Sequence, residues 1–106
     1  MAQFDVHRNS GRNREAIPFV VVVQSALYDG FRRRVVVPLV RKAQLSDLPD
    51  SALNPAFRVE GVDVVLHPLE IVSVACDQLG ARIGSLGEEG NRIAAALDEL
   101  LTQAWR

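Results

Sequence analysis

The chain has 106 residues, of which 48% are hydrophobic, and its formal charge at pH 7 is −1. This length suits one domain, residues 1–106, and the apolar content excludes wholesale disorder. A core of this modest size favours dimerisation as a way to bury more apolar surface. Its single cysteine, Cys76, excludes an internal disulfide, and without a Cys/His cluster we expect neither a metal site nor a cofactor.

We do not expect the N-terminal residues to form a signal peptide. They lack a basic segment followed by an apolar stretch, which a signal peptide requires. No apolar run in the chain approaches the roughly 18 residues of a membrane span. We therefore expect a cytoplasmic protein that does not associate with membranes.

Charge is distributed unevenly along the chain. Residues 1–58 carry nine Lys/Arg and five Asp/Glu, whereas residues 59–106 carry three and eight. Eleven of the cations are Arg, which suits recognition of carboxylates, although a GC-rich genome also supplies Arg. A chain polarised in this way is suited to bind an acidic partner or a second copy of itself.

Short apolar runs separated by turn residues predict a strand-rich protein. Phe4 and Val6 alternate with polar neighbours, which indicates a half-buried strand over residues 3–7. The polar, turn-rich stretch that follows, to Glu15, predicts an exposed loop.

The middle of the chain predicts further strands. The β-branched runs 17–24 and 33–39, joined by a turn at residues 28–30, predict an antiparallel pair in which the first strand is buried on both faces. Residues 57–66 predict a hairpin around Glu60-Gly61. The remaining segments are a loop over 45–55 with room for one helical turn, and an apolar strand over 71–75.

The clearest predicted element is a C-terminal helix. Its acidic start at Glu88 and Glu89 suits the helix dipole, and Ser85 with Glu88 matches a capping box. We expect the helix to run to the final residue, which leaves Trp105 and Arg106 at an accessible end. A single apolar stripe follows it through Ile93, Ala94, Leu97, Leu100, Leu101 and Ala104.

No motif for phosphate binding, metalloprotease chemistry or a nucleophilic serine is present. His7 and His67 lie far apart in the sequence, so nothing in their spacing indicates catalysis. Cys76 ends an apolar run and is interpreted as a small core residue, because a nucleophile would need a nearby base or dipole.

Two exposed groups are ambiguous. Arg32, Arg33 and Arg34 indicate either a solvated strand end or nucleic-acid binding, with Arg32 and Arg34 on one face of the strand. Trp105 extends the apolar stripe of the helix, so it either packs within the protein or anchors a partner.

Several short motifs occur together in order. The stretch 21–25 reads V-V-V-Q-S, and 33–39 reads R-R-V-V-V-P-L. Leu-Ser-Asp at 45–47, Leu-Asn-Pro at 53–55, Gln3-Phe4 and Ser73-Val74 follow the same scheme. In this order and spacing the chain resembles the CcdB family of DNA gyrase-poisoning toxins over nearly its whole length, with about two extra residues before Ile17.

The resemblance implies an α+β, mainly β fold: an SH3-like barrel with a small extra sheet and a C-terminal α-helix. It implies a homodimer that is not an enzyme and makes no direct sequence-specific contact with nucleic acid. Such a toxin of a plasmid or chromosomal toxin–antitoxin pair binds the gyrase A subunit and traps the enzyme on cleaved DNA. A CcdA-like antitoxin neutralises it by coupled folding and binding.

The resemblance also implies two binding sites. Gyrase binding falls on the extreme C-terminus, where the family typically ends in Gly-Ile and this chain ends in Trp105-Arg106. The residues expected to bind gyrase are Leu101, Thr102, Gln103, Ala104, Trp105 and Arg106. The residues expected to bind the antitoxin are Arg8, Arg12, Arg14, Leu27 and Tyr28.

Two alternatives remain open from the sequence. One is an endoribonuclease toxin of the MazF and Kid type, for which Asp29, Arg33, Arg34 and His67 are the candidate groove residues. The other is a non-toxic CcdB-like protein that binds its antitoxin only.

Overall fold

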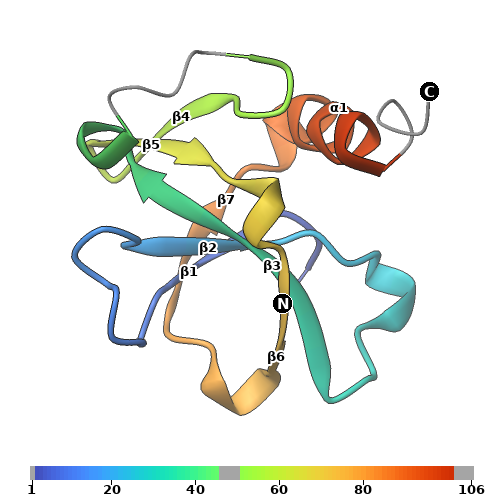
Figure 1. The fold of residues 1–106 in the computed structure, drawn as a ribbon. Helices are drawn as coiled ribbons and strands as arrows, with labels where there is room; N and C mark the ends of the chain where they lie inside the picture. Colours follow the sequence, from blue (N-terminus) through green and yellow to red (C-terminus); the bar gives the residue numbers. More distant parts are fainter. Residues whose placement is uncertain (1, 46–50, 102–106) are drawn as a thin grey trace.

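In the part of the chain that the structure describes, seven antiparallel strands form one curled sheet with one α-helix packed against it (Figure 1). This computed structural model describes residues 2–45 and 51–101. The strands are β1 Asp5–Arg8, β2 Phe19–Val22, β3 Arg33–Arg41, β4 Ala56–Val59, β5 Val62–Leu66, β6 Val72–Ala75 and β7 Arg82–Ser85. The helix α1 spans Gly90–Leu101, and short 3₁₀ turns include η1 Ala26–Tyr28, η3 Pro68–Glu70, η4 Cys76–Gln78 and η5 Gly87–Glu89.

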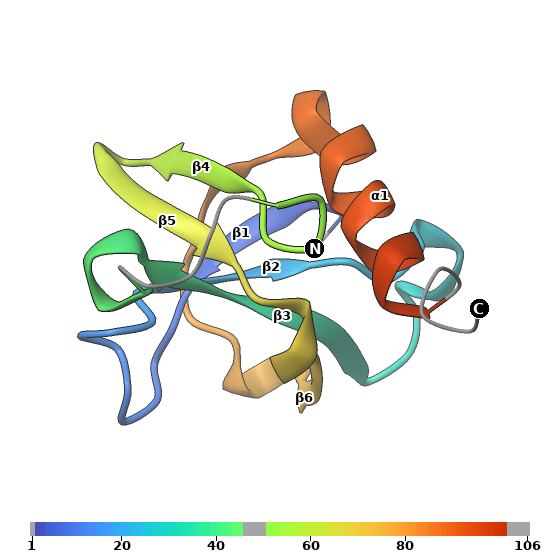
Figure 2. The same ribbon diagram turned by 45° about the horizontal axis from the view of Figure 1, so that its top comes forward.

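The long strand β3 organises the sheet. The strand order is β4-β5-β3-β2-β1-β7, and β6 pairs with β3 outside this path. The first half of β3 pairs with β6 and its last residues pair with β5, while β2 pairs along the middle. Pro38, which has no N–H to donate, lies between the two stretches. One strand therefore serves two sub-sheets, and Figure 2 shows β6 on the side of β3 opposite to α1 and the β4–β5 hairpin.

The core lies between the curled sheet and α1. Strands β2 and β3 are rich in valine, which packs well on a pleated surface, and both are almost entirely buried, as expected for the segment 17–24. The buried cluster comprises Val6, Phe19, Val21, Val23, Val37, Leu39, Phe57, Val59, Val64, Leu66, Leu86, Ile93 and Ala96. The predicted α+β, mainly β architecture closed by a C-terminal helix is confirmed.

The strand β1 is more buried than predicted, because the sequence does not indicate its neighbour β7. Asp5 and His7 are buried along with Val6, so β1 is not half-buried. The reason is β7, which pairs with β1 on the side away from β2. The segment of β7, Arg-Ile-Gly-Ser, holds one large apolar residue and gives no strand pattern.

The start of α1 also differs. The predicted capping box is wrong, because Ser85 belongs to β7 and its hydroxyl accepts the backbone N–H of Gly87 at 3.0 Å, one turn before the helix. Within α1, Ile93 is buried and Leu97 packs against the core as predicted, but the stripe takes Ala96 in place of Ala94. Leu101, also predicted on the stripe, is exposed. The predicted continuation to Arg106 lies outside the described residues. No helix in the described ranges is long and apolar enough to cross a membrane.

An ion pair between β1 and β7 predicts how the stability of the fold changes at acidic pH. Burial acts to raise the pKa of Asp5, but hydrogen bonds from Arg82 at 3.0 Å and the backbone N–H of Ala2 at 2.8 Å, with the nearby positive charge, outweigh burial and lower the pKa below its ordinary 3.8. A carboxyl group whose pKa is lower in the folded state stabilises the fold at pH values above its unfolded-state pKa. This stabilisation is lost as the pH falls through the folded-state pKa.

We therefore expect Asp5→Asn to lower the free energy of unfolding by about 1–2 kcal/mol at pH 7, with the difference from wild type shrinking below about pH 4. Urea unfolding across pH 2–7 measures it. Asp63→Asn is the control, because Asp63 is exposed and lies 3.6 Å from Arg58. A difference that stays constant down to pH 2 contradicts the assignment.

Candidate partner-binding surfaces

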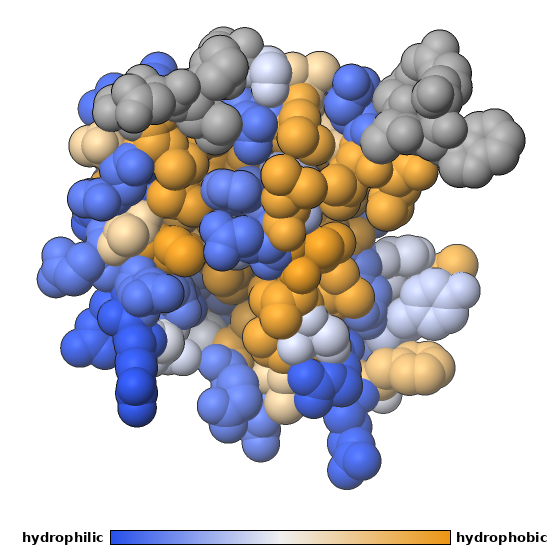
Figure 3. Space-filling model, viewed as in Figure 1, coloured by the Kyte–Doolittle hydropathy of each residue, from blue (hydrophilic) through white to orange (hydrophobic). Residues whose placement is uncertain are grey.

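Large apolar side chains are exposed on the face of the molecule shown in Figure 3, over η3, β6 and the end of α1. A soluble monomer rarely exposes many such side chains together, so a patch of this kind marks a docking surface. Leu27 is 85% exposed, Leu101 71% and Leu69 66%. We define the apolar face as Leu27, Tyr28, Phe31, Leu69, Ile71, Val72 and Leu101.

The η1 part of the apolar face is held rigidly. Ser25 caps the turn by accepting the backbone N–H of Leu27 at 3.2 Å, and the Gln24 side chain donates to the Tyr28 carbonyl at 3.1 Å. The rings of Tyr28 and Phe31 meet edge to face with centroids 5.9 Å apart. These contacts keep the apolar residues ordered while they face solvent, which lowers the entropy lost on binding.

A buried arginine fixes the loop that follows η1. The side chain of Arg34 is 4% exposed, and its guanidinium donates to the carbonyls of Asp29, Phe31 and Arg33. The predicted shared face for Arg32 and Arg34 is wrong, because β3 begins at Arg33 and Arg32 lies in the loop before it. Arg34 therefore acts as a structural clamp on the aromatic loop.

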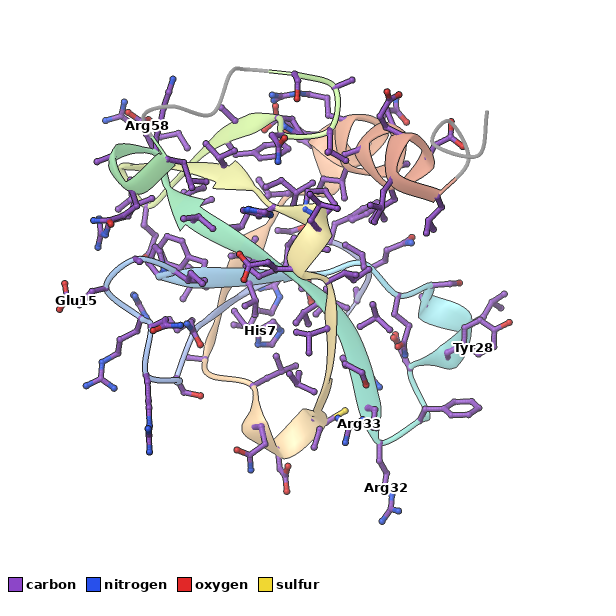
Figure 4. All side chains as sticks on the ribbon, viewed as in Figure 1. His7, Glu15, Tyr28, Arg32, Arg33 and Arg58 are labelled. Carbon is purple, nitrogen blue, oxygen red and sulfur yellow. The ribbon has the colours of Figure 1, made fainter. Side chains whose placement is uncertain are left out.

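The other two arginines of this cluster differ in role. Arg33 binds β6 through Ser73, with 2.8 Å to the hydroxyl and 2.9 Å to the carbonyl. Figure 4 shows Arg32 extending away from the ribbon. With Arg34 buried, Arg32 and Arg33 are the members of this cluster that remain at the surface.

A second candidate surface is a groove of about 240 Å³ beneath the loop between β1 and β2. We call it the arginine groove. Its floor is apolar, and its rim carries Arg8 and Arg12. The floor consists of Ile17, Val20, Val36, Pro38, Val72, Val74 and Leu79.

The loop over the arginine groove is shaped by its own polar side chains. The Asn9 amide donates to the Ile17 carbonyl at 2.8 Å and accepts the backbone N–H of Gly11 at 2.9 Å. Ser10 donates to the Gln78 carbonyl at 3.1 Å and so bridges the loop to η4. The exposed loop predicted from its polar sequence is thus present and folded over apolar strands.

The structure divides the residues expected to bind an antitoxin. Arg8 and Arg12 line the arginine groove, whereas Leu27 and Tyr28 belong to the apolar face. Arg14 is exposed on the same loop but does not line the groove. Of the residues expected to bind gyrase, Leu101 is exposed at the end of α1, and residues 102–106 lie outside the described part of the chain.

Four members of the apolar face were not predicted as site residues: Phe31, Leu69, Ile71 and Val72. The segment 71–75 was read as an apolar strand, but β6 lies at an edge and its first residues are exposed. No sequence pattern marks Leu69, which follows Pro68 in η3, as an exposed site residue. An apolar residue in a turn is the pattern that would have indicated these positions.

The two histidines and the cysteine each contact a different group in the described ranges. His7 is buried with its Nδ1 2.9 Å from the Gly80 carbonyl, and His67 lies 3.7 Å from Glu70. Cys76 is half-buried and donates weakly to the Phe31 carbonyl, so it is not the core residue that was predicted. Residues 2–45 and 51–101 bring together no three side chains of the His, Cys, Asp and Glu types that would hold a metal ion.

The family model described as CcdB protein matches residues 3–103, nearly the whole chain. No curated protein matches the chain with significance.

Proposed function

We propose that this chain, which belongs to the CcdB family of toxin–antitoxin toxins, acts by binding rather than by catalysis. Its target is the DNA gyrase A subunit, which it traps on cleaved DNA, and a CcdA-like antitoxin neutralises it. The observation that carries this proposal is the exposed end of α1 at Leu101, where the residues expected to bind gyrase begin, because an exposed apolar side chain at a helix end suits docking onto a larger protein. The engagement of Asp29, Arg33 and Arg34 within the fold speaks against an endoribonuclease groove.

A direct assay tests this function. Purified protein is incubated with gyrase and plasmid DNA, and cleaved DNA covalently attached to gyrase is measured after denaturation. Accumulation of cleaved complexes supports the proposal, and no effect at micromolar concentration contradicts it. Cleavage of total RNA by the same protein would indicate an endoribonuclease, and harmless expression without an antitoxin would indicate a protein that binds its antitoxin only.

We further propose that a second copy of the chain covers the centre of the apolar face and forms a homodimer. Leu69 in η3, Ile71 just after η3 and Val72 at the start of β6 are all exposed, and Val72 also lies at the edge shared with the arginine groove. An isologous interface places the same patch on both subunits, so three such residues per chain supply six apolar side chains. Burying them removes the apolar surface that a monomer leaves in water.

Leu69→Glu tests the dimer. A two-fold axis brings the new carboxylate near its own copy, so we expect the dimer dissociation constant to rise at least tenfold, or about 1.4 kcal/mol. Sedimentation velocity over a concentration series measures it. Ala95→Glu adds the same charge on the exposed side of α1 and leaves the dimer intact. A monomeric wild type, or equal dissociation constants for both variants, contradicts the proposal.

For the antitoxin, the arginine groove is the site that its chemistry supports. An apolar floor with Arg8 and Arg12 at the rim fits a segment in which acidic and apolar residues alternate. Such a segment, disordered when free, gains its order on binding. Leu27 and Tyr28 provide a second contact on the apolar face, which an extended antitoxin tail reaches separately.

A further inference from the structure

One residue outside the arginine groove interacts directly with its rim. Glu60 Oε1 lies 2.9 Å from Arg8 Nη2, and both side chains are about half exposed. Glu60 sits at the tip of the β4–β5 hairpin, where it has a φ of +49° and the next residue, Gly61, has a φ of +77°. This tight turn fixes the carboxylate beside the end of β1, so the contact joins segments 52 residues apart in sequence.

The guanidinium of Arg8 therefore has two possible carboxylate partners. Arg8 lines the groove that an acidic segment is proposed to enter, and it already holds the carboxylate of Glu60. A second carboxylate at this guanidinium is repelled by the first, or must displace it. Exposed ion pairs of this kind are weak, so displacement is possible at modest cost.

We infer that Glu60 is an internal competitor for Arg8, and that the Arg8–Glu60 ion pair limits the affinity of the arginine groove for acidic ligands. This inference rests on the proposed antitoxin site. It identifies Glu60 as a residue that sets the affinity although it does not line the groove. It also identifies the Arg8–Glu60 ion pair as a contact that opens when an acidic segment binds.

Glu60→Gln removes the competing charge and keeps the size of the side chain. We expect it to raise the affinity for a synthetic peptide of alternating glutamate and leucine by about two- to fivefold, the range that the strength of an exposed ion pair allows. Asp63→Asn is the matched control, since it removes the same charge from the same hairpin but its partner is Arg58, which does not line the groove. Calorimetric titration at low and physiological salt measures both variants.

The following results distinguish the competition at Arg8 from the assignment of the groove. The gain in affinity of Glu60→Gln must disappear when the peptide carries glutamine in place of glutamate, and when Arg8→Gln is combined with it. Equal affinities of wild type and Glu60→Gln, or equal gains in Glu60→Gln and Asp63→Asn, overturn the competition while leaving the groove as an acidic-peptide site. Failure of every variant to bind the acidic peptide overturns the antitoxin assignment of the groove and the competition together.

Discussion

Gly80→Ala is expected to lower the free energy of unfolding by about 3 kcal/mol, the upper part of the range for overpacked sites. An added Cβ at Gly80 would lie 2.4 Å from the Arg8 carbonyl oxygen and 3.1 Å from its carbonyl carbon. These are backbone atoms of β1, so they cannot rotate away as a side chain does. Relief requires β1 and β7 to separate, which also strains the 2.9 Å contact between His7 and the Gly80 carbonyl.

Gly84→Ala is the matched control for this substitution. Gly84 lies in β7, pairs with Val6, and an added Cβ there meets nothing within 4 Å. We expect its stability to match wild type or to rise by about 0.5 kcal/mol, because glycine within a strand costs conformational entropy. Urea denaturation of both variants measures the difference, and equal stabilities would show that the β1–β7 junction yields easily.

Trp105→Ala is expected to weaken gyrase binding by about 2 kcal/mol or more, a loss of roughly 30-fold, with folding nearly intact. Tryptophan is the residue most enriched among interface hot spots, and Trp105 follows the exposed end of α1 at Leu101. Folding should survive because the described contacts of α1 with the core come from Ile93, Ala96 and Leu97. Titration of the gyrase A subunit measures the affinity, and thermal unfolding measures stability.

Asp98→Ala serves as the control for Trp105→Ala. Asp98 is exposed on α1, one turn before Leu101, and is outside the proposed gyrase-binding residues. We expect it to bind the gyrase A subunit as wild type does. If Trp105→Ala also binds as wild type does, the anchor lies elsewhere on the surface, with the apolar face as the next candidate.

Elements with a strong local pattern could be predicted from the sequence. The runs around Val21 and Val37 carry enough β-branched residues to fix two strands and their pairing. The hairpin at Glu60-Gly61 followed from its turn residues. By contrast, β7 forms because β1 offers a free edge, and no local pattern encodes that pairing.

The candidate sites divide in the same way. The resemblance to the CcdB family implies Leu101 and the arginines of the first loop, and the structure places them on the surface. The clamp formed by Arg34 does not, because burial of an arginine depends on three carbonyls that only the folded loop supplies. The role inferred for Glu60 likewise depends on a contact across the curled sheet.

The placement of β1 has a consequence for synthesis of this protein on the ribosome. The first strand lies between β2 and β7, and Leu86 and Ile93, near the end of the chain, complete the core. An emerging polypeptide that stops before residue 82 leaves one edge of β1 bare and the interior open. The fold can therefore close only after the residues of β7 and α1 have been synthesised, and a shorter product cannot present a finished binding surface.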